Sequence, residues 1–141
     1  METLSMATEE HELVVPIKAD VDIVMARQRA RNLVSSLHFS SSELTLIATA
    51  ISEIARNIVS YAGEGEIVLQ LAARDRRRGL VIIARDRGPG IADVERAMQD
   101  GFSTSKGLGL GLPGSKRLMD EFELVSEPGK GTIVTMVKWE R

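Results

Sequence analysis

The chain of 141 residues is 43% apolar and 27% charged, which is typical of one globular domain with a single core and unlike a disordered or membrane chain. Its formal net charge of −2 argues against a broad basic surface for nucleic acid or anionic lipid. Because the chain has no cysteine, disulfides, thiolate metal sites and thiol nucleophiles are excluded.

The N-terminal stretch M-E-T-L-S-M-A-T-E-E-H-E is unlike a secretory signal, because it carries acids where a signal needs bases and has no apolar run. No segment of the sequence is long and apolar enough to span a bilayer. We therefore expect a single domain over residues 1–141, located in the cytoplasm, with residues 1–11 as a disordered tail.

The first predicted element is a β-branched strand over residues 12–18, in which Pro16 favours an edge position. Apolar residues at helical spacing then predict a helix up to Leu37, with Asp20 or Asp22 as its N-cap. A second helix follows, capped by Ser41 or Ser42 and ending near Gly63.

The second half of the chain predicts mainly strands. Residues 67–73 and 80–84 form a hairpin across the basic turn R-D-R-R-R, and residues 122–126 and 132–139 form another across E-P-G-K-G. Between the hairpins we expect a short amphipathic piece over 92–98 and a helix from Pro113 to Met119.

Strands that follow one another without crossover helices pair antiparallel. The predicted fold class is therefore α/β (α+β), a two-layer sandwich in which a mostly antiparallel mixed sheet is covered on one face by helices. A repeating βαβ Rossmann series does not fit this order of elements.

Within the second helix, Glu53 and Asn57 are four residues apart and project from the same side, away from the apolar stripe. Taken alone, the two would be a solvated pair on a surface helix. Asn57, however, is a poor residue for a helix interior. A carboxylate and an amide oxygen at this spacing could instead place a proton acceptor beside a ligand for a hard cation, as phosphoryl transfer requires.

The stretch A-R-D-R-G-P-G-I follows an apolar strand. Asp86 could accept a hydrogen bond from an exocyclic amine, while Gly88 and Gly90 leave room for a flat base. An ordinary Asx turn followed by a Pro-Gly turn explains the same residues.

The stretch S-K-G-L-G-L-G-L-P-G, residues 105–114, places glycines 107, 109 and 111 just before a predicted helix, where free N–H groups suit phosphate. It is not a Walker A loop, because its lysine precedes the glycines, and no strand directly precedes it as in a Rossmann motif. Lys106 could reach a γ-phosphate or be solvated. The intervening leucines, which must pack somewhere, argue against a flexible linker.

Four short motifs occur in the order of the N, G1, G2 and G3 boxes of the GHKL ATPases: Glu53-x-x-x-Asn57, Asp86-x-Gly88-x-Gly90, Gly107-x-Gly109-x-Gly111 and Gly131-Thr132. The chain resembles that superfamily. It is most similar to its small anti-sigma-factor serine kinases, and among these to the RsbT-type switch kinases of bacterial stress signalling. This similarity rests on I-S-E-I-A-R-N-I-V-S-Y-A-G-E-G, D-R-G-P-G-I, D-G-F-S-T-S, G-L-P-G-S-K-R-L-M-D-E-F and V-K-W-E-R, and extends from Val21 onward.

The resemblance implies the Bergerat ATP-binding fold, with ATP between the second helix and a lid over residues 91–111. It implies Glu53 as general base, Asn57 as the Mg²⁺ ligand, and Asp86 with Thr132 and a water as partners of the adenine amino group. Arg56 could contact phosphate or partner, or form a surface salt bridge. The other implied ATP-binding residues are Gly88, Gly90, Ser105, Lys106, Gly107, Leu108, Gly109, Leu110 and Gly111.

The function implied by the resemblance is that of an ATP-dependent protein serine/threonine kinase with ATP and Mg²⁺ as cofactors. Its substrates would be STAS-domain proteins of the RsbS and RsbR type. Their phosphorylation would release the kinase, which would then bind and activate a PP2C-type phosphatase of the RsbU type. No nucleic-acid or membrane partner is expected.

Three other functions are compatible with such a pocket. A histidine kinase catalytic domain would need a phosphoacceptor helix and a dimerisation domain, for which we see no room. An anti-sigma factor or nucleotide-dependent binding module would sequester its partner without phosphorylating it, although mere binding would not require Glu53. A plain ATPase working by lid closure would need a second domain to move.

Overall fold

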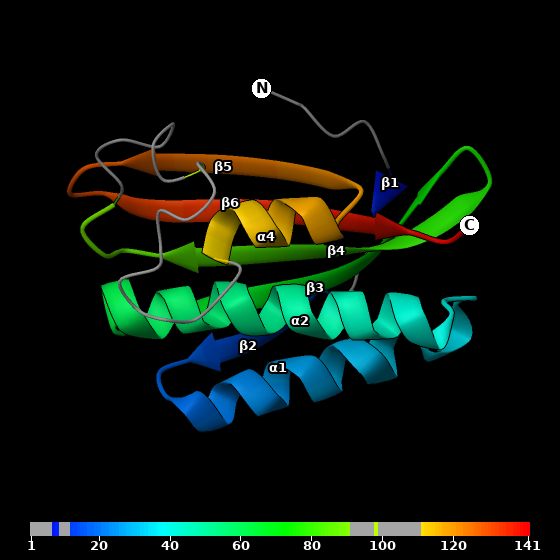
Figure 1. Cartoon of the computed structure of the whole chain (residues 1–141), viewed down its shortest axis with the longest axis horizontal. Coiled ribbons are helices and arrows are strands. Elements are labelled where there is room, and N and C mark those ends of the chain that lie inside the picture. The colour runs from blue at the N-terminus through cyan, green and yellow to red at the C-terminus, as the bar shows by residue number, and fades with distance from the viewer. Residues whose placement is uncertain (1–6, 9–11, 91–97, 99–110) are drawn as a thin grey trace.

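The computed structural model describes residues 7–8, 12–90, 98 and 111–141 (Figure 1). Its strands are β1 (Ala7–Thr8), β2 (Leu13–Ile17), β3 (Gly65–Arg74), β4 (Arg77–Asp86), β5 (Glu121–Glu127) and β6 (Gly131–Trp139). Its helices are α1 (Asp20–Leu33), a 3₁₀ turn (Val34–Ser36), α2 (Ser41–Asn57), a π turn (Ile58–Ala62) and α4 (Gly111–Leu118). Within these residues, no helix combines the length and the apolar character needed to cross a bilayer.

The strands form one sheet in the order β1-β3-β4-β6-β5, with β2 also beside β3. Every pair in the described part of the chain is antiparallel, so the prediction of a mostly antiparallel sheet is confirmed. Among the described strands, β2 pairs only with β3, which places Pro16 on an edge strand as predicted. In the stretch 1–11, expected to be a tail, Ala7 and Thr8 pair with Ala73 and Ala72.

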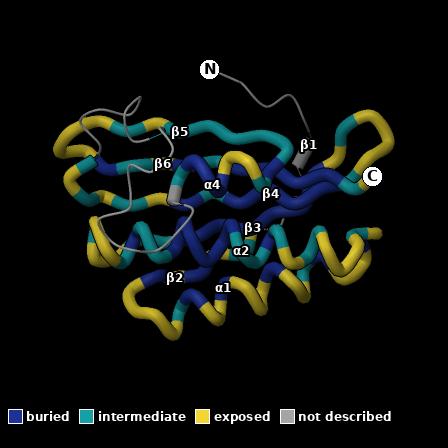
Figure 2. Tube along the Cα trace, in the orientation of Figure 1, coloured by how far each residue is buried: buried dark blue, intermediate teal, exposed yellow. Residues whose placement is uncertain are grey.

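The helices α1, α2 and α4 cover one face of the sheet, and α2 packs between the other two (Figure 1). The core lies between the helices and the strands, whose inward-facing residues are coloured as buried in Figure 2. Its fully buried side chains include Ile51 and Ile54 from α2, Leu69 from β3 and Ile82 from β4. Because each such side chain contributes about 1.5–3 kcal/mol when buried, the two-layer packing is what holds the fold together.

In each of the two long helices, a carboxylate of the first turn accepts a hydrogen bond from the backbone N–H of the N-cap residue. Ser40 precedes α2 and accepts from the Glu43 N–H at 3.1 Å, while the Glu43 carboxylate accepts from the Ser40 N–H at 3.0 Å. The N-cap of α1 is Ala19, and Asp22 accepts from its N–H at 3.1 Å. The predicted caps are therefore each misplaced: Ser40 precedes the serines that we expected, and Asp22 acts from inside the first turn.

The turn between β3 and β4 is shorter than the basic run R-D-R-R-R suggests. Arg74 pairs with Arg77, so only Asp75 and Arg76 form the turn, with φ of 50° and 73°. Two consecutive residues with positive φ make a type I′ turn, which matches the twist of the flanking strands.

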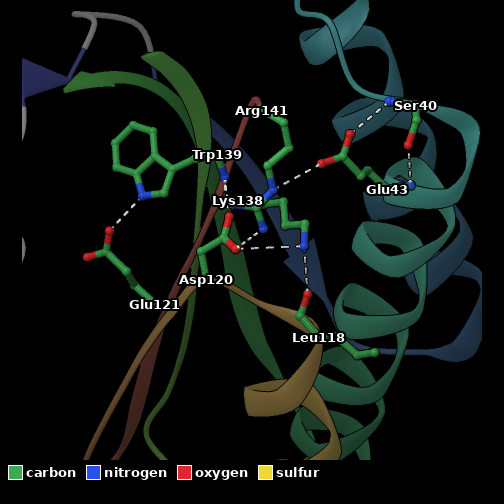
Figure 3. A network of polar contacts seen from close by, with 8 residues as sticks. All are labelled: Ser40, Glu43, Leu118, Asp120, Glu121, Lys138, Trp139 and Arg141. Atoms are coloured by element: carbon green, nitrogen blue, oxygen red, sulfur yellow. Dashed lines mark hydrogen bonds and ion pairs between the residues drawn. The ribbon is translucent and has the colours of Figure 1, made fainter. Parts of the chain in front are cut away.

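A polar network anchors the C-terminal strand to the helices (Figure 3). The Lys138 side chain is only 7% exposed, donates to the Leu118 carbonyl at 3.2 Å, and lies 3.9 Å from the Asp120 carboxylate. Arg141 donates to the same carboxylate at 2.7 Å and pairs with Glu43 at 3.8 Å. The end of α4, the start of α2 and the last residues of the chain are thereby tied together.

Candidate active site

The carboxylate of Glu53 is buried in α2, with its side chain only 11% exposed. We expected it on the exposed side of the helix, and that expectation is wrong. Because α2 is flanked by both α1 and α4, more of its circumference is covered than its apolar stripe indicates. Arg56, one turn further on, forms an ion pair with Glu53 at 3.5 Å, which is one of the contacts that the sequence left open.

Asn57 is half-buried and is the last residue of α2, where the helix widens into the π turn. Its amide lies one helical turn beyond Glu53, on the same side. In the described part of the chain, no three Asp, Glu or His side chains group to form a metal cage. A magnesium ion would therefore fit here only in the way usual for nucleotide enzymes, on one protein oxygen together with phosphate and water oxygens.

Asp86 is the last residue of β4 and faces the helices, since every second residue of a strand shares a face and Asp86 follows the buried residues Ile82 and Ala84 at that spacing. Its Oδ1 accepts from the Gly88 N–H at 2.9 Å, so the Asx turn that we considered is present. Its Oδ2 is the oxygen that this turn leaves for a ligand. Thr132 on β6 stands directly opposite Asp86, on the same face of the sheet.

Gly88 and Gly90 follow Asp86, and close packing within the protein requires a glycine at both positions, a reason that the sequence did not suggest. A Cβ at Gly88 would lie 2.6 Å from the Cβ of Ala62, and one at Gly90 would lie 2.1 Å from the Glu127 carbonyl oxygen. A side chain at either position would therefore clash with protein atoms. These glycines let the 87–90 loop pack against the π turn and against β5, and a direct contact with the base stays a prediction.

One polar residue at this end of the sheet was missed. Ser126 on β5 pairs with Thr132, and their hydroxyl oxygens are 2.8 Å apart. The turn signal E-P-G-K-G could have revealed it, because a hairpin closed by that turn places Ser126 opposite Thr132.

Most of the predicted glycine-rich phosphate loop lies outside the described residues, namely Ser105, Lys106, Gly107, Leu108, Gly109 and Leu110. Gly111, expected in that loop, is instead the first residue of α4, so the helix begins two residues before Pro113.

A groove of about 440 Å³ runs between α1 and α2 on the outside of the molecule. It is lined by Glu53, by the arginines 27, 31 and 56, and by hydroxyls that include Thr49 and Ser52. The Thr49 and Ser52 hydroxyls donate to backbone carbonyls of α2, and Arg27 donates to Ser52 at 3.3 Å. The groove is therefore basic apart from Glu53 and can receive an acidic segment.

A second hollow, of about 890 Å³, lies at the strand ends beside Asp86. Part of its lining, including Glu66, Arg85 and Ile133, comes from residues that alternate with the helix-facing ones. Other lining residues, including Asp86 and Ser126, lie on the helix-facing side, so the hollow reaches both faces of the sheet around the strand ends.

A family model described as the histidine kinase-like ATPase domain matches residues 17–138. The chain belongs to this family. Its match spans every element from the end of β2 to β6, and the fold expected from the resemblance is thereby confirmed.

Among its relatives, the serine/threonine-protein kinase RsbT of Bacillus subtilis is 54% identical over 127 residues, 90% of this chain and 96% of that protein. The anti-sigma F factor of Caldanaerobacter subterraneus is 39% identical over 101 residues, 69% of this chain and 71% of that protein. The anti-sigma F factor of Halalkalibacterium halodurans is 33% identical over 118 residues, 80% and 81% of the two chains.

These similarities confirm the expected class of enzyme. This member of the histidine kinase-like ATPase family is a protein serine/threonine kinase of partner-switching signalling, and it uses ATP.

Proposed function

We propose that this kinase transfers the γ-phosphoryl group of ATP to a serine or threonine of a STAS-domain protein of the RsbS and RsbR type. The observation that carries the proposal is the position of Glu53, a buried carboxylate that lines a basic groove open to the outside. A base buried in this way is shielded from bulk water, while the groove gives a protein hydroxyl access to it.

In the proposed reaction, Glu53 accepts the proton of the acceptor hydroxyl, and the hydroxyl oxygen forms a bond to the γ-phosphorus. The bond from that phosphorus to the β,γ-bridging oxygen breaks, and ADP leaves. The Arg56 guanidinium, 3.5 Å from Glu53, holds the carboxylate in place beside the groove. Magnesium, when bound by Asn57 and the phosphates, would offset negative charge on the transferring group.

The nucleotide would be held at both ends. Asp86 and Thr132 would bind the adenine amino group at the sheet ends, supported by their opposed positions on one face. Gly88 and Gly90 would shape the loop beside the base. Backbone amides of residues 107–110, with Ser105, Lys106 and Gly111, would bind the phosphates ahead of α4.

We further propose that phosphorylation of the acceptor ends its complex with the kinase. We propose that the freed kinase then binds and activates a PP2C-type phosphatase of the RsbU type. This step rests on the similarity to RsbT and on the partner-switching role expected of such kinases.

A second candidate function is a nucleotide-dependent anti-sigma factor that binds its partner without phosphorylating it. The relatives named as anti-sigma F factors, at 33% to 39% identity, favour it. The retention of a buried carboxylate at Glu53 favours the kinase, because binding alone needs no base.

The test is to incubate the purified protein with radiolabelled ATP, Mg²⁺ and a STAS-domain protein, and to identify the labelled amino acid. We expect phosphoserine or phosphothreonine on the STAS protein, and no label with Asp86→Asn, which should not bind nucleotide. A stable complex with the STAS protein that carries no label would favour the binding module. Label transfer that survives Asp86→Asn would overturn the assignment of the adenine site.

A further inference from the structure

Three polar side chains stand in a row across the ends of β4, β6 and β5. The register pairs Asp86 with Thr132 and Thr132 with Ser126, so all three project from the face of the sheet that the helices cover. Directly opposed residues on neighbouring strands have Cβ atoms about 5 Å apart. A ligand group that reaches Asp86 therefore also reaches Thr132, while Ser126 stands behind it.

The hydrogen bonds of Ser126 determine in which direction the hydroxyl protons of this row point. Its hydroxyl donates to the Gly131 carbonyl oxygen at 3.1 Å, and a carbonyl can only accept. A serine hydroxyl has one proton, so toward Thr132, at 2.8 Å, the Ser126 oxygen must accept. The Thr132 proton consequently points at Ser126, away from Asp86.

With its proton committed to Ser126, Thr132 can offer a ligand only the lone pairs of its oxygen. Asp86 also offers only lone pairs, since its Oδ1 already accepts from Gly88 and its ionised carboxylate has no proton to donate. The two neighbouring groups are thus both acceptors. A water between them would donate to both and would present its own lone pair to the ligand.

We propose that Ser126 is a specificity-determining residue: by orienting the Thr132 proton, it makes the base pocket accept a purine with a 6-amino group and reject one with a 6-oxo group. The proposal rests on the nucleotide site at Asp86 proposed above. A 6-amino group donates to the acceptor pair directly or through water. A 6-oxo group would face lone pairs with no donor, and buried groups left unpaired in this way give strong discrimination.

The test compares the binding of ADP and GDP, measured by calorimetry with Mg²⁺, for the wild type, Ser126→Ala and Ser126→Thr. We expect the wild type to prefer ADP. In Ser126→Ala the Thr132 hydroxyl can rotate and donate to a 6-oxo group, so the ratio of the two dissociation constants should fall by about tenfold, the worth of one hydrogen bond. Ser126→Thr keeps a hydroxyl and should keep the ratio.

Thr132→Val separates this role from general damage to the fold. Once Thr132 is gone, removal of the Ser126 hydroxyl should no longer change the ratio, so Ser126→Ala with Thr132→Val should match Thr132→Val alone. The proposal is overturned if Ser126→Ala keeps the wild-type ratio, or if it weakens ADP and GDP equally. A wild type that binds ADP with no dependence on Asp86 would instead refute the nucleotide site itself.

Discussion

The carboxylate of Glu53 lies 3.5 Å from the guanidinium of Arg56, and their side chains are 11% and 34% exposed. Glu53, the more buried residue of this pair, is the proposed base. Glu53→Gln keeps the size and shape of the side chain but removes the proton acceptor, so it should slow phosphoryl transfer by about 10²–10⁴-fold. Single-turnover transfer from radiolabelled ATP measures the rate, and calorimetry should show ADP binding unchanged. Glu123→Gln on β5 is the control. Transfer at the wild-type rate in Glu53→Gln would remove the base assignment.

The basic groove predicts which surface charges matter for the acceptor protein. Arg31 lines the groove, whereas Arg29, on the same helix, is exposed and does not. Arg31→Glu should raise KM for the STAS protein several-fold and leave ADP binding unchanged, because charge reversal repels an acidic segment. Arg29→Glu, with the same change in net charge, should have little effect. Equal effects of the two substitutions would argue against docking in the groove.

The close approach of β6 to Asp86 requires a glycine at position 131. A Cβ there would lie 2.1 Å from the Asp86 carbonyl oxygen, and φ is +98°. Gly131→Ala should therefore lower the free energy of unfolding by about 2–4 kcal/mol, through overpacking together with backbone strain. Gly129 also has a positive φ, of 79°, but open space around it. Gly129→Ala should cost only about 1 kcal/mol, and urea unfolding of both variants measures the difference.

The sequence located the elements closely but not the interactions between them. Turn signals and alternation predict residues 122–126 and 132–139 as strands, and the structure extends each by one residue or two. The burial of Glu53 could not be predicted, because it depends on α1 and α4 packing on both sides of α2. A period of 3.6 residues reports only the most apolar face of a helix.

The polar residues at the ends of β4, β5 and β6 were only partly predictable, again because their roles depend on contacts between elements. Asp86 follows an apolar strand and is visible in the sequence, whereas Ser126 acquires meaning only through its pairing with Thr132. The close packing at Gly88 and Gly90 could not be predicted, because the atoms next to them belong to residues distant in the sequence, and their role beside the base stays a prediction.

The type I′ turn of the β3–β4 hairpin offers a stabilising substitution. Arg76 has φ of 73°, a conformation that costs a residue with a Cβ about 1–2 kcal/mol and glycine much less. Arg76→Gly should raise the free energy of unfolding by about 0.5–1 kcal/mol, and Asp-Gly is the preferred pair for this turn. Arg77→Gly, in the first residue of β4, should instead destabilise. Denaturant midpoints of the two variants should move in opposite directions.

Glu140 makes the stability of the fold depend on pH. The His38 N–H donates to its carboxylate at 2.7 Å and the Arg78 N–H at 3.2 Å. These bonds, led by that from His38, hold the pKa of Glu140 below its ordinary value of 4.5. A lowered folded-state pKa contributes stability that is present above the unfolded value and is lost as pH falls through the folded one.

Glu140→Gln should therefore be less stable than the wild type above pH 4.5, and the difference should shrink at lower pH. Urea unfolding between pH 3 and about pH 7 measures the difference, with Glu64→Gln, an exposed residue, as the control. A difference that stays constant across this range would contradict the proposed contacts.

The two ends of α4 are held to the rest of the protein by different interactions. Its last residue, Leu118, is held through its carbonyl by the buried Lys138, whereas its earlier residues are held by packing, with Leu112 against the core and Ser115 fully buried. A helix of eight residues is about 12 Å long. Both ends of this length are therefore fixed to the body of the protein, so we expect α4 to keep its angle to α2 as a rigid support when phosphate binds ahead of Gly111.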